Sequence, residues 1–325
     1  MIQVFGTLGP ACAEQKTLEA MFRVGMTGMR LNLSHTGLAE SSDLLAAFHA
    51  AAKAAGIDAQ LLIDMQGPEL RIGGLKAPLM LTEGETVLLG EGGIPLPAVL
   101  EGYLTPGQEL MLDDGRLLVR VLDKEHAAVL RGGVLKGHKS VKLPGIEVQL
   151  PLLTQHDIDN LKKASAYGVT ALMQPFVRSG ADLAGVRAIL KEIGAPEVQI
   201  FAKIESMAGV RELEGIIEQA DVVIIARGDL GNDMPLWQLP AVQKHIAAAC
   251  RKAGKPFITV TQMLASMEQN PVPTRAEVSD IFNAVADGSW GVMLTGETAA
   301  GRWPVEAITY MANTAREAEH WLQNT

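Results

Sequence analysis

The sequence predicts an α/β protein built as a closed (β/α)₈ barrel, of the TIM type, with a small all-β domain inserted after the third strand. Eight short apolar runs alternate with segments of helical hydrophobic period. Polar or charged residues follow nearly every run, whereas an open doubly wound sheet, the alternative, would gather them at one switch point. The alternation is interrupted once, by short β-type runs broken by glycine and proline.

Each strand of the barrel is expected where an apolar run ends in polar residues. The eight strands are expected, in chain order, at Gln3–Thr7, Gly28–Asn32, Gln60–Asp64, Thr170–Gln174, Val198–Ala202, Val222–Ala226, Pro256–Thr261 and Gly291–Leu294. The barrel is assigned to residues 1–71 and 143–325, and the inserted domain to residues 72–142. Gly67-Pro68 and Leu143-Pro144-Gly145 are the expected hinges.

Helix starts give the clearest local signals. Thr154-x-x-Asp157 and Thr274-x-x-Glu277 have the spacing of a capping box, and Pro304 opens the last helix. The helix after Thr154 is expected to run to Tyr167. One helix is expected between the fifth and sixth strands, with its apolar stripe at Val210, Leu213, Ile216 and Ile217.

Composition excludes several classes of protein. The chain has 325 residues, a net charge of −9 and no basic block, which argues against nucleic acid or an anionic membrane surface as partner. We expect no signal peptide, and no apolar run is long enough to span a bilayer. Cys12 and Cys250 are too few for a disulfide framework or a zinc site, so we expect a cytoplasmic protein.

The stretch from Ile200 to Gly231 carries the strongest chemical signal. Lys203 and Glu205 follow one strand, and Asp229 follows the next. Two carboxylates at adjacent strand ends suit magnesium or manganese, or they form a solvated rim pair balanced by Lys203 and Arg227. Lys203 and Glu205 point the same way along a strand. The ammonium group either stabilises developing negative charge or forms a structural ion pair.

Other strand ends offer groups for anions and cations. Arg30, Arg71 and Arg178 together indicate an anionic substrate, in particular a phosphate. Gly228 and Gly231 leave backbone N–H groups open to an anion, although any tight turn needs glycine. Residues at two neighbouring strand ends offer oxygen atoms that could hold a monovalent cation or simply complete a hydrogen-bonded strand end. These residues are Asn32, Ser34 and Asp64.

Nine segments, taken together, resemble one family over nearly the whole chain. They are TLGPAC (Thr7–Cys12), MRLNLSHT (Met29–Thr36), IDMQGPELRIG (Ile63–Gly73), MLDDG (Met111–Gly115), AKIES (Ala202–Ser206), ARGDLG (Ala226–Gly231), TQMLASM (Thr261–Met267), PTRAEVSD (Pro273–Asp280) and LTGETAAGRWPVEA (Leu294–Ala307). In this order they are similar to pyruvate kinase.

The resemblance implies glycolytic phosphoryl transfer from phosphoenolpyruvate to ADP, giving pyruvate and ATP, with Mg²⁺ (or Mn²⁺) and K⁺. The inserted domain would close as a lid. The implied catalytic residues are Lys203, Arg30, Thr261 and Arg71. The implied substrate-binding residues are Gly228, Asp229, Arg178, Thr295 and Glu297. The implied nucleotide-binding residues are Pro10, Asn32, His35 and Lys139.

The metal ligands and two finer roles also come from the resemblance. Magnesium would take Glu205 and Asp229, and potassium would take Asn32, Ser34, Asp64 and the Met65 carbonyl. Thr261 would help to deliver a proton to the enolate carbon through water. Glu69 is the acidic residue that the family associates with potassium dependence.

Departures from the family pattern leave other functions open. The sequence stops at the last barrel helix, so we expect neither the family's C-terminal domain nor its activation by sugar phosphates. Gln174-Pro175-Phe176 stands where Ala-Ser-Phe is usual, and Met65, Gln66 and Ser206 also depart. The alternatives are a magnesium-enolate lyase or decarboxylase acting on oxaloacetate or a related pyruvate-forming acid, and a non-catalytic binding homologue. Nucleotide preference and homo-oligomerisation through the barrel stay open.

Overall fold

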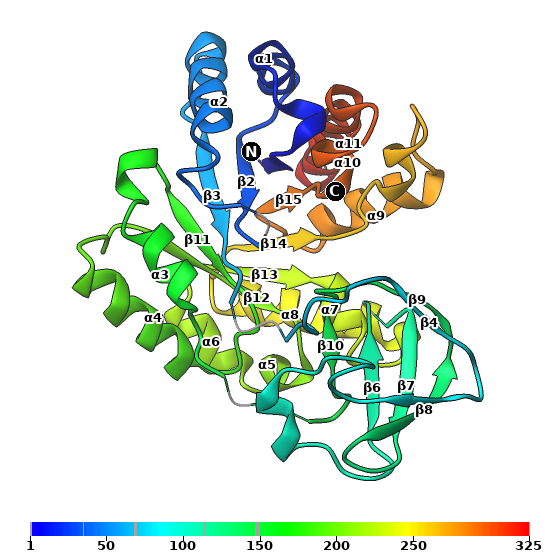
Figure 1. The fold of residues 1–325 in the computed structure, drawn as a ribbon. Helices are drawn as coiled ribbons and strands as arrows, with labels where there is room; N and C mark the ends of the chain where they lie inside the picture. The colour runs from blue at the N-terminus through cyan, green and yellow to red at the C-terminus, as the bar shows by residue number, and fades with distance from the viewer. Residues whose placement is uncertain are drawn as a thin grey trace. The chain divides into compact units, whose positions relative to one another are not determined.

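The computed structural model describes residues 2–34, 36–67, 70–113, 115–146, 148 and 150–324. The chain divides into two compact units, Met1–Gly67 with Leu152–Thr325, and Pro68–Pro151. The first unit contains the barrel and the second contains the inserted β structure, in cyan and green in Figure 1. Each is described by itself.

Eight parallel strands form a closed ring in the first unit. They are β1 (Gln3–Thr7), β2 (Gly28–Asn32), β3 (Gln60–Asp64), β11 (Ala171–Gln174), β12 (Gln199–Ile204), β13 (Val222–Ala226), β14 (Phe257–Val260) and β15 (Gly291–Met293). Their order around the ring is β1-β15-β14-β13-β12-β11-β3-β2. The closed ring confirms the predicted (β/α)₈ barrel and excludes the open sheet. Because β3 pairs directly with β11, the insertion leaves the ring intact.

Helices lie outside the ring of strands and cover it (Figure 1). The α-helices are α1 (Gln15–Arg23), α2 (Ser42–Ala55), α3 (Gln155–Leu161), α4 (Gly180–Glu192), α5 (Met207–Arg211), α6 (Leu213–Gln219), α7 (Arg227–Gly231), α8 (Leu239–Lys252), α9 (Arg275–Ala286), α10 (Gly296–Ala299) and α11 (Pro304–Asn324). Short 3₁₀ turns occur at η1 (Pro10–Cys12), η3 (Ser165–Tyr167), η4 (Leu236–Gln238) and η5 (Ala265–Glu268). Both predicted capping boxes are present, at the starts of α3 and α9.

Two helix predictions are wrong in extent. The predicted single helix between β12 and β13 breaks at Glu212 into α5 and α6. A Cβ atom built at Gly209 would lie 2.6 Å from the Val177 carbonyl oxygen, so α5 packs closely on the backbone after β11, whereas α6 packs on α4. The two halves therefore have different neighbours. Helix α3 ends at Leu161 rather than Tyr167, and the chain turns at Gly168 with φ +68°.

The second unit is antiparallel and has its own core. Its strands are β4 (Leu79–Leu81), β5 (Thr86–Leu88), β6 (Glu109–Leu112), β7 (Leu117–Val121), β8 (His126–Arg131), β9 (Gly133–Leu135) and β10 (Val141–Lys142). They form a five-stranded sheet, β10-β6-β7-β8-β5, and a pair, β4-β9; one 3₁₀ turn, η2, covers Ala98–Gly102. Alternating side chains such as Leu110, Leu112, Val119 and Val121 are buried in this core.

Among the described residues, no helix is both long enough and apolar enough to cross a bilayer.

Candidate active site at the barrel mouth

Four charged side chains form a buried network at the C-terminal ends of β2, β3 and β12. The Lys203 Nζ atom lies 3.2 Å from Asp64 Oδ1 and 2.9 Å from Glu205 Oε1. On its other side, Asp64 Oδ2 lies 2.6 Å from Nη2 of Arg30. Lys203 and Glu205 do point the same way, as strand alternation predicts. The side chains of Arg30 and Lys203 are each 15% exposed, so water screens this network weakly.

The charges in this network are fixed by their neighbours. Burial raises the pKa of the Asp64 carboxyl, but Lys203 and Arg30 outweigh it and hold that pKa below its ordinary value. Burial likewise opposes the charge on Lys203, and the carboxylates of Asp64 and Glu205 outweigh it and raise the pKa of Lys203. Lys203 is therefore an ammonium ion, aimed at the same region as the Arg30 guanidinium.

Glu205 behaves differently from Asp64 because a second acid lies near it. Burial is the largest cause that raises the pKa of Glu205; the charge of Asp229 adds to it, and the Lys203 ammonium opposes it. Asp229 is in the first turn of α7, at the end of β13. The second Glu205 oxygen, Oε2, accepts the Phe176 N–H at 2.8 Å. The Glu205 carboxylate, after β12, thus interacts with Phe176, after β11, and with Asp229, after β13.

This donor set fits a hard divalent cation. Two neighbouring carboxylates of like charge are stabilised by a cation between them, and magnesium commonly takes one or two carboxylates and keeps several waters. The described residues contain no group of three or more His, Cys, Asp and Glu side chains suited to a metal ion, as a transition-metal cage would need. Glu205 and Asp229 thus fit a magnesium ion, and magnesium binding here stays a prediction.

The end of β14 brings Thr261 against the turn that carries Asp229. Thr261 has φ +74° and the next residue, Gln262, has φ +55°, both in the left-handed region. A Cβ atom built at Gly228 would lie 3.1 Å from Thr261 Cγ2. The side chain of Thr261 therefore lies against Gly228, and a side chain at position 228 would crowd it.

Other predicted substrate residues have different partners. The Glu297 carboxylate is 1% exposed and accepts the N–H groups of Leu264 (3.0 Å) and Thr295 (2.8 Å). This geometry favours a role in holding two loops rather than contact with substrate. The Arg178 guanidinium, just before α4, pairs with Asp182 in the first turn of that helix, with Nε 3.2 Å from Oδ2.

Two predicted residues belong to the second unit. Arg71 donates to the His138 carbonyl at 2.9 Å, and the Lys139 ammonium lies 2.6 Å from Asp113 Oδ1. The convergence of Arg71 and Lys139 with the barrel residues stays a prediction. His35 and Glu69 lie outside the described residues.

The predicted potassium ligands lie together at the ends of β2 and β3. Asn32 Oδ1 accepts the Ser34 N–H at 3.1 Å, and the Asp64 carbonyl accepts the Leu33 N–H at 2.9 Å. Met65 follows Asp64 directly and is buried. These bonds complete a hydrogen-bonded strand end, the simpler of the two sequence interpretations. Binding of a monovalent cation here stays a prediction.

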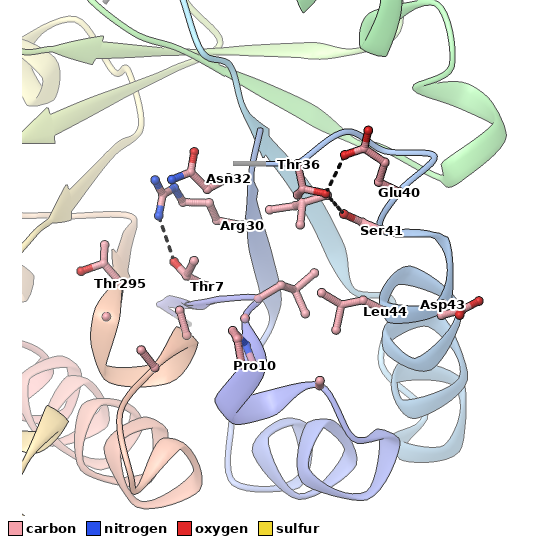
Figure 2. A pocket seen from close by; sticks show the side chains of 17 residues that line it. Thr7, Pro10, Arg30, Asn32, Thr36, Glu40, Ser41, Asp43, Leu44 and Thr295 are labelled. Atoms are coloured by element: carbon pink, nitrogen blue, oxygen red, sulfur yellow. Dashed lines mark hydrogen bonds between the residues drawn. The ribbon is translucent and has the colours of Figure 1, made fainter. Parts of the chain in front are cut away.

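A cavity of about 780 Å³ opens beside the charged network. It is lined by Thr7, Leu8, Gly9, Pro10, Ala13, Arg30, Leu31, Asn32, Thr36, Glu40, Ser41, Asp43, Leu44, Thr295, Gly296, Ala299 and Ala300. Figure 2 shows Arg30 and Asn32 on one side of it and Pro10 and Leu44 on others, with Arg30 Nη1 3.3 Å from Thr7 Oγ1. Its volume is in the range of small-molecule and cofactor sites. Two predicted nucleotide residues, Pro10 and Asn32, line it.

Sequence reasoning missed residues that act through the backbone. Asp157 was predicted only as a helix cap, yet its fully buried carboxylate also accepts the N–H groups of Gln66 (2.9 Å) and Gly67 (3.1 Å). The same carboxylate accepts both the N–H and the hydroxyl of Thr154 at 2.8 Å. Arg227 was considered only as a balancing charge. No sequence spacing indicates such partners, because they lie far along the chain.

The end of β11, where the sequence departs from the family pattern, is tightly packed. Gln174 is fully buried and donates its amide to the Leu152 carbonyl at 3.0 Å, while within the described residues its Oε1 atom has no hydrogen-bond partner. A Cβ atom built at Gly67 would lie 2.3 Å from Pro175 Cγ. Phe176, which donates to Glu205, has φ +52°. Pro175 therefore packs on the turn that follows β3.

Comparison with known proteins agrees with this geometry. The family model described as "Pyruvate kinase, barrel domain" matches residues 1–308. The chain is 37% identical to a pyruvate kinase of Geobacillus stearothermophilus, over 98% of this chain and 57% of that protein. It is 39% identical to one of Staphylococcus epidermidis, over 96% of this chain and 56% of that protein.

A solved structure, a pyruvate kinase from Cryptosporidium parvum, superposes with a TM-score of 0.90 at 33% identity and covers 98% of this chain and 69% of that one. The chain thus spans a little over half the length of the Geobacillus stearothermophilus and Staphylococcus epidermidis relatives. By its sequence, its closed barrel and the residues at the barrel mouth, the chain belongs to the pyruvate kinase family.

Proposed function

We propose that this chain transfers the phosphoryl group of phosphoenolpyruvate to ADP, giving pyruvate and ATP. The observation that carries the proposal is the buried network of Arg30, Asp64, Lys203 and Glu205 beside Asp229. It places two cations, Arg30 and Lys203, around the Asp64 carboxylate, and it brings a second carboxylate, Glu205, near Asp229, where the two acids could hold a divalent cation. Such a site suits a substrate whose negative charge moves during the reaction.

Each residue has a defined task in this proposal. The Lys203 ammonium and the Arg30 guanidinium neutralise the phosphoryl group and the enolate oxygen. The backbone N–H groups around Gly228 and Asp229 bind the substrate carboxylate. Thr261 holds a water that delivers a proton to C3 of the enolate. The cavity beside Arg30 takes the nucleotide.

Cations complete the proposed site. Magnesium or manganese, held by Glu205 and Asp229, would supply Lewis-acid stabilisation of the transferring phosphoryl group. Potassium would bind the oxygen atoms of Asn32, Ser34, Asp64 and Met65. Residues 72–142 would act as a lid that excludes water, with Lys139 as its anion contact and Arg71, just before the lid, as a second one. Arg178 would add positive charge near the phosphate, and Glu297 would position Thr295. We place the activity in the cytoplasm.

A coupled assay tests the proposal directly. The purified chain should form ATP and pyruvate from phosphoenolpyruvate and ADP when Mg²⁺ and K⁺ are both present, and lose that activity when EDTA removes the divalent cation. Replacing K⁺ with tetramethylammonium should lower the rate. Turnover of oxaloacetate without nucleotide, together with no ATP formation, would instead support the decarboxylase alternative.

A further inference from the structure

Arg227 directs its guanidinium group at the backbone around Thr261. Its Nε donates to the Val260 carbonyl at 3.2 Å, and its Nη2 donates to the Thr261 carbonyl at 2.7 Å. Its Nη1 lies 2.7 Å from an oxygen of Asp280, which is on α9. The Arg227 side chain is 12% exposed, so the ion pair and both carbonyl contacts are largely shielded from water.

These bonds fix an unfavourable backbone conformation. The Val260 and Thr261 carbonyls belong to the two peptide planes on either side of the Thr261 Cα atom. One rigid guanidinium group that binds both carbonyls therefore fixes φ and ψ of Thr261. That φ is +74°, which is rare and unfavourable for a β-branched residue. The conformation persists because surrounding groups hold it.

The held conformation decides where the Thr261 side chain lies. In it, Thr261 Cγ2 packs over Gly228, the residue before Asp229 in α7. In the ordinary extended conformation, the side chain of Thr261, the residue after β14, would point in a different direction. Arg227, the first residue of α7, thus sets the position of the Thr261 hydroxyl at the end of the next strand, β14.

We propose that Arg227 is the positioning residue that holds Thr261 in its left-handed conformation, so that the Thr261 hydroxyl can act in enolate protonation. The effect on enolate protonation rests on the proposed function. The effect on the Thr261 backbone does not, and it can be measured separately. Arg227 does not touch the substrate in this proposal and acts only through Thr261.

A double-mutant cycle tests the catalytic part. Thr261→Ala should lower kcat about a hundredfold, as loss of a proton-transfer group does. Arg227→Lys keeps the positive charge beside Asp280 but loses the fork that binds two carbonyls, and should lower kcat about tenfold. Because Arg227 acts through Thr261, the double variant should be no slower than Thr261→Ala alone. The KM for phosphoenolpyruvate should stay within about twofold in both single variants.

A matched control is Arg187→Lys. Arg187 also binds an aspartate (Asp221, 2.8 Å) and a backbone carbonyl (Gln219, 3.3 Å), but at the N-terminal end of β13. Its kcat should equal that of the unchanged chain. If Arg227→Lys folds and keeps full kcat, or slows the Thr261→Ala variant as much as it slows the parent, the inference is overturned.

Hydrogen exchange separates this inference from the proposed function. Backbone amides in the peptide covering residues 260–267 should exchange at least tenfold faster in Arg227→Lys than in Arg187→Lys. Faster exchange there supports the positioning role even if the parent chain makes no ATP, in which case only the proposed function fails. Unchanged exchange would overturn the positioning role whatever the activity.

Discussion

The two halves of the barrel mouth use charged residues in different ways. At the ends of β2, β3 and β12, charged side chains bind one another, as in the Lys203–Asp64 and Lys203–Glu205 pairs. At the ends of β14 and β15, charged side chains bind backbone groups. Arg227 holds two carbonyls, and Glu297 holds two N–H groups.

The two halves differ in whether a charged side chain remains directed toward a region where a ligand can bind. In the first half, opposite charges shift one another's pKa, and the cations remain directed toward a region where an anion can bind. In the second half, Arg227 and Glu297 bind the backbone of loops, and Arg227 also pairs with Asp280. A charged residue at a strand end is therefore not in itself evidence of ligand contact; its partner must be known.

The largest effect should come from the side-chain half. Lys203→Met removes the ammonium that neutralises the reacting oxygen and leaves Asp64 and Glu205 less well paired. We expect kcat for ATP formation to fall about a thousandfold, the upper end for loss of one such group. Lys244→Met is the control, since Lys244 forms a half-exposed pair with Asp287. A folded Lys203→Met variant with more than a tenth of the parent activity would contradict the assigned role.

A smaller, different effect is expected from the backbone half. Glu297→Gln keeps the shape of the side chain but weakens two charge-assisted bonds, to the N–H groups of Leu264 and Thr295. We expect the free energy of unfolding in urea to fall by about 1–3 kcal/mol and kcat to fall about tenfold, with KM unchanged. A raised KM for phosphoenolpyruvate at unchanged stability would show that Glu297 contacts substrate instead.

The smallest effect concerns pH and Glu277, which also binds backbone. Burial opposes its charge, but bonds from Ser266 and Thr274 outweigh it and hold the pKa of Glu277 below its ordinary value of 4.5. A lowered pKa in the folded state adds stability at pH values above 4.5, and this is lost as pH falls through the folded-state pKa.

Urea unfolding of Glu277→Gln and the parent chain checks this. The parent should be the more stable near neutral pH, and the difference should shrink in acid. A difference that grows as pH falls would refute the assigned direction.

Sequence pattern predicted the barrel because its strands are short, mainly apolar runs with polar residues at or just after their ends. It also predicted that Lys203 and Glu205 lie on the same side, because side chains two residues apart in a strand point the same way. It could not predict which groups the Arg227 side chain binds, because the partners of a long side chain depend on tertiary packing and not on its place in the sequence. In the inserted domain, strands β6, β9 and β10, of four, three and two residues, were missed because such short strands barely show alternation.

The Asp157 carboxylate has a consequence for protein engineering. One of its oxygen atoms accepts both the Gly67 N–H, where the chain leaves the barrel, and the Thr154 N–H, just after it returns. Two chain segments bound to one atom lie close enough for a tight turn to join them. Since β3 and β11 pair directly, a deletion that replaces residues 68–151 with a few turn-forming residues should leave a barrel that closes on its own.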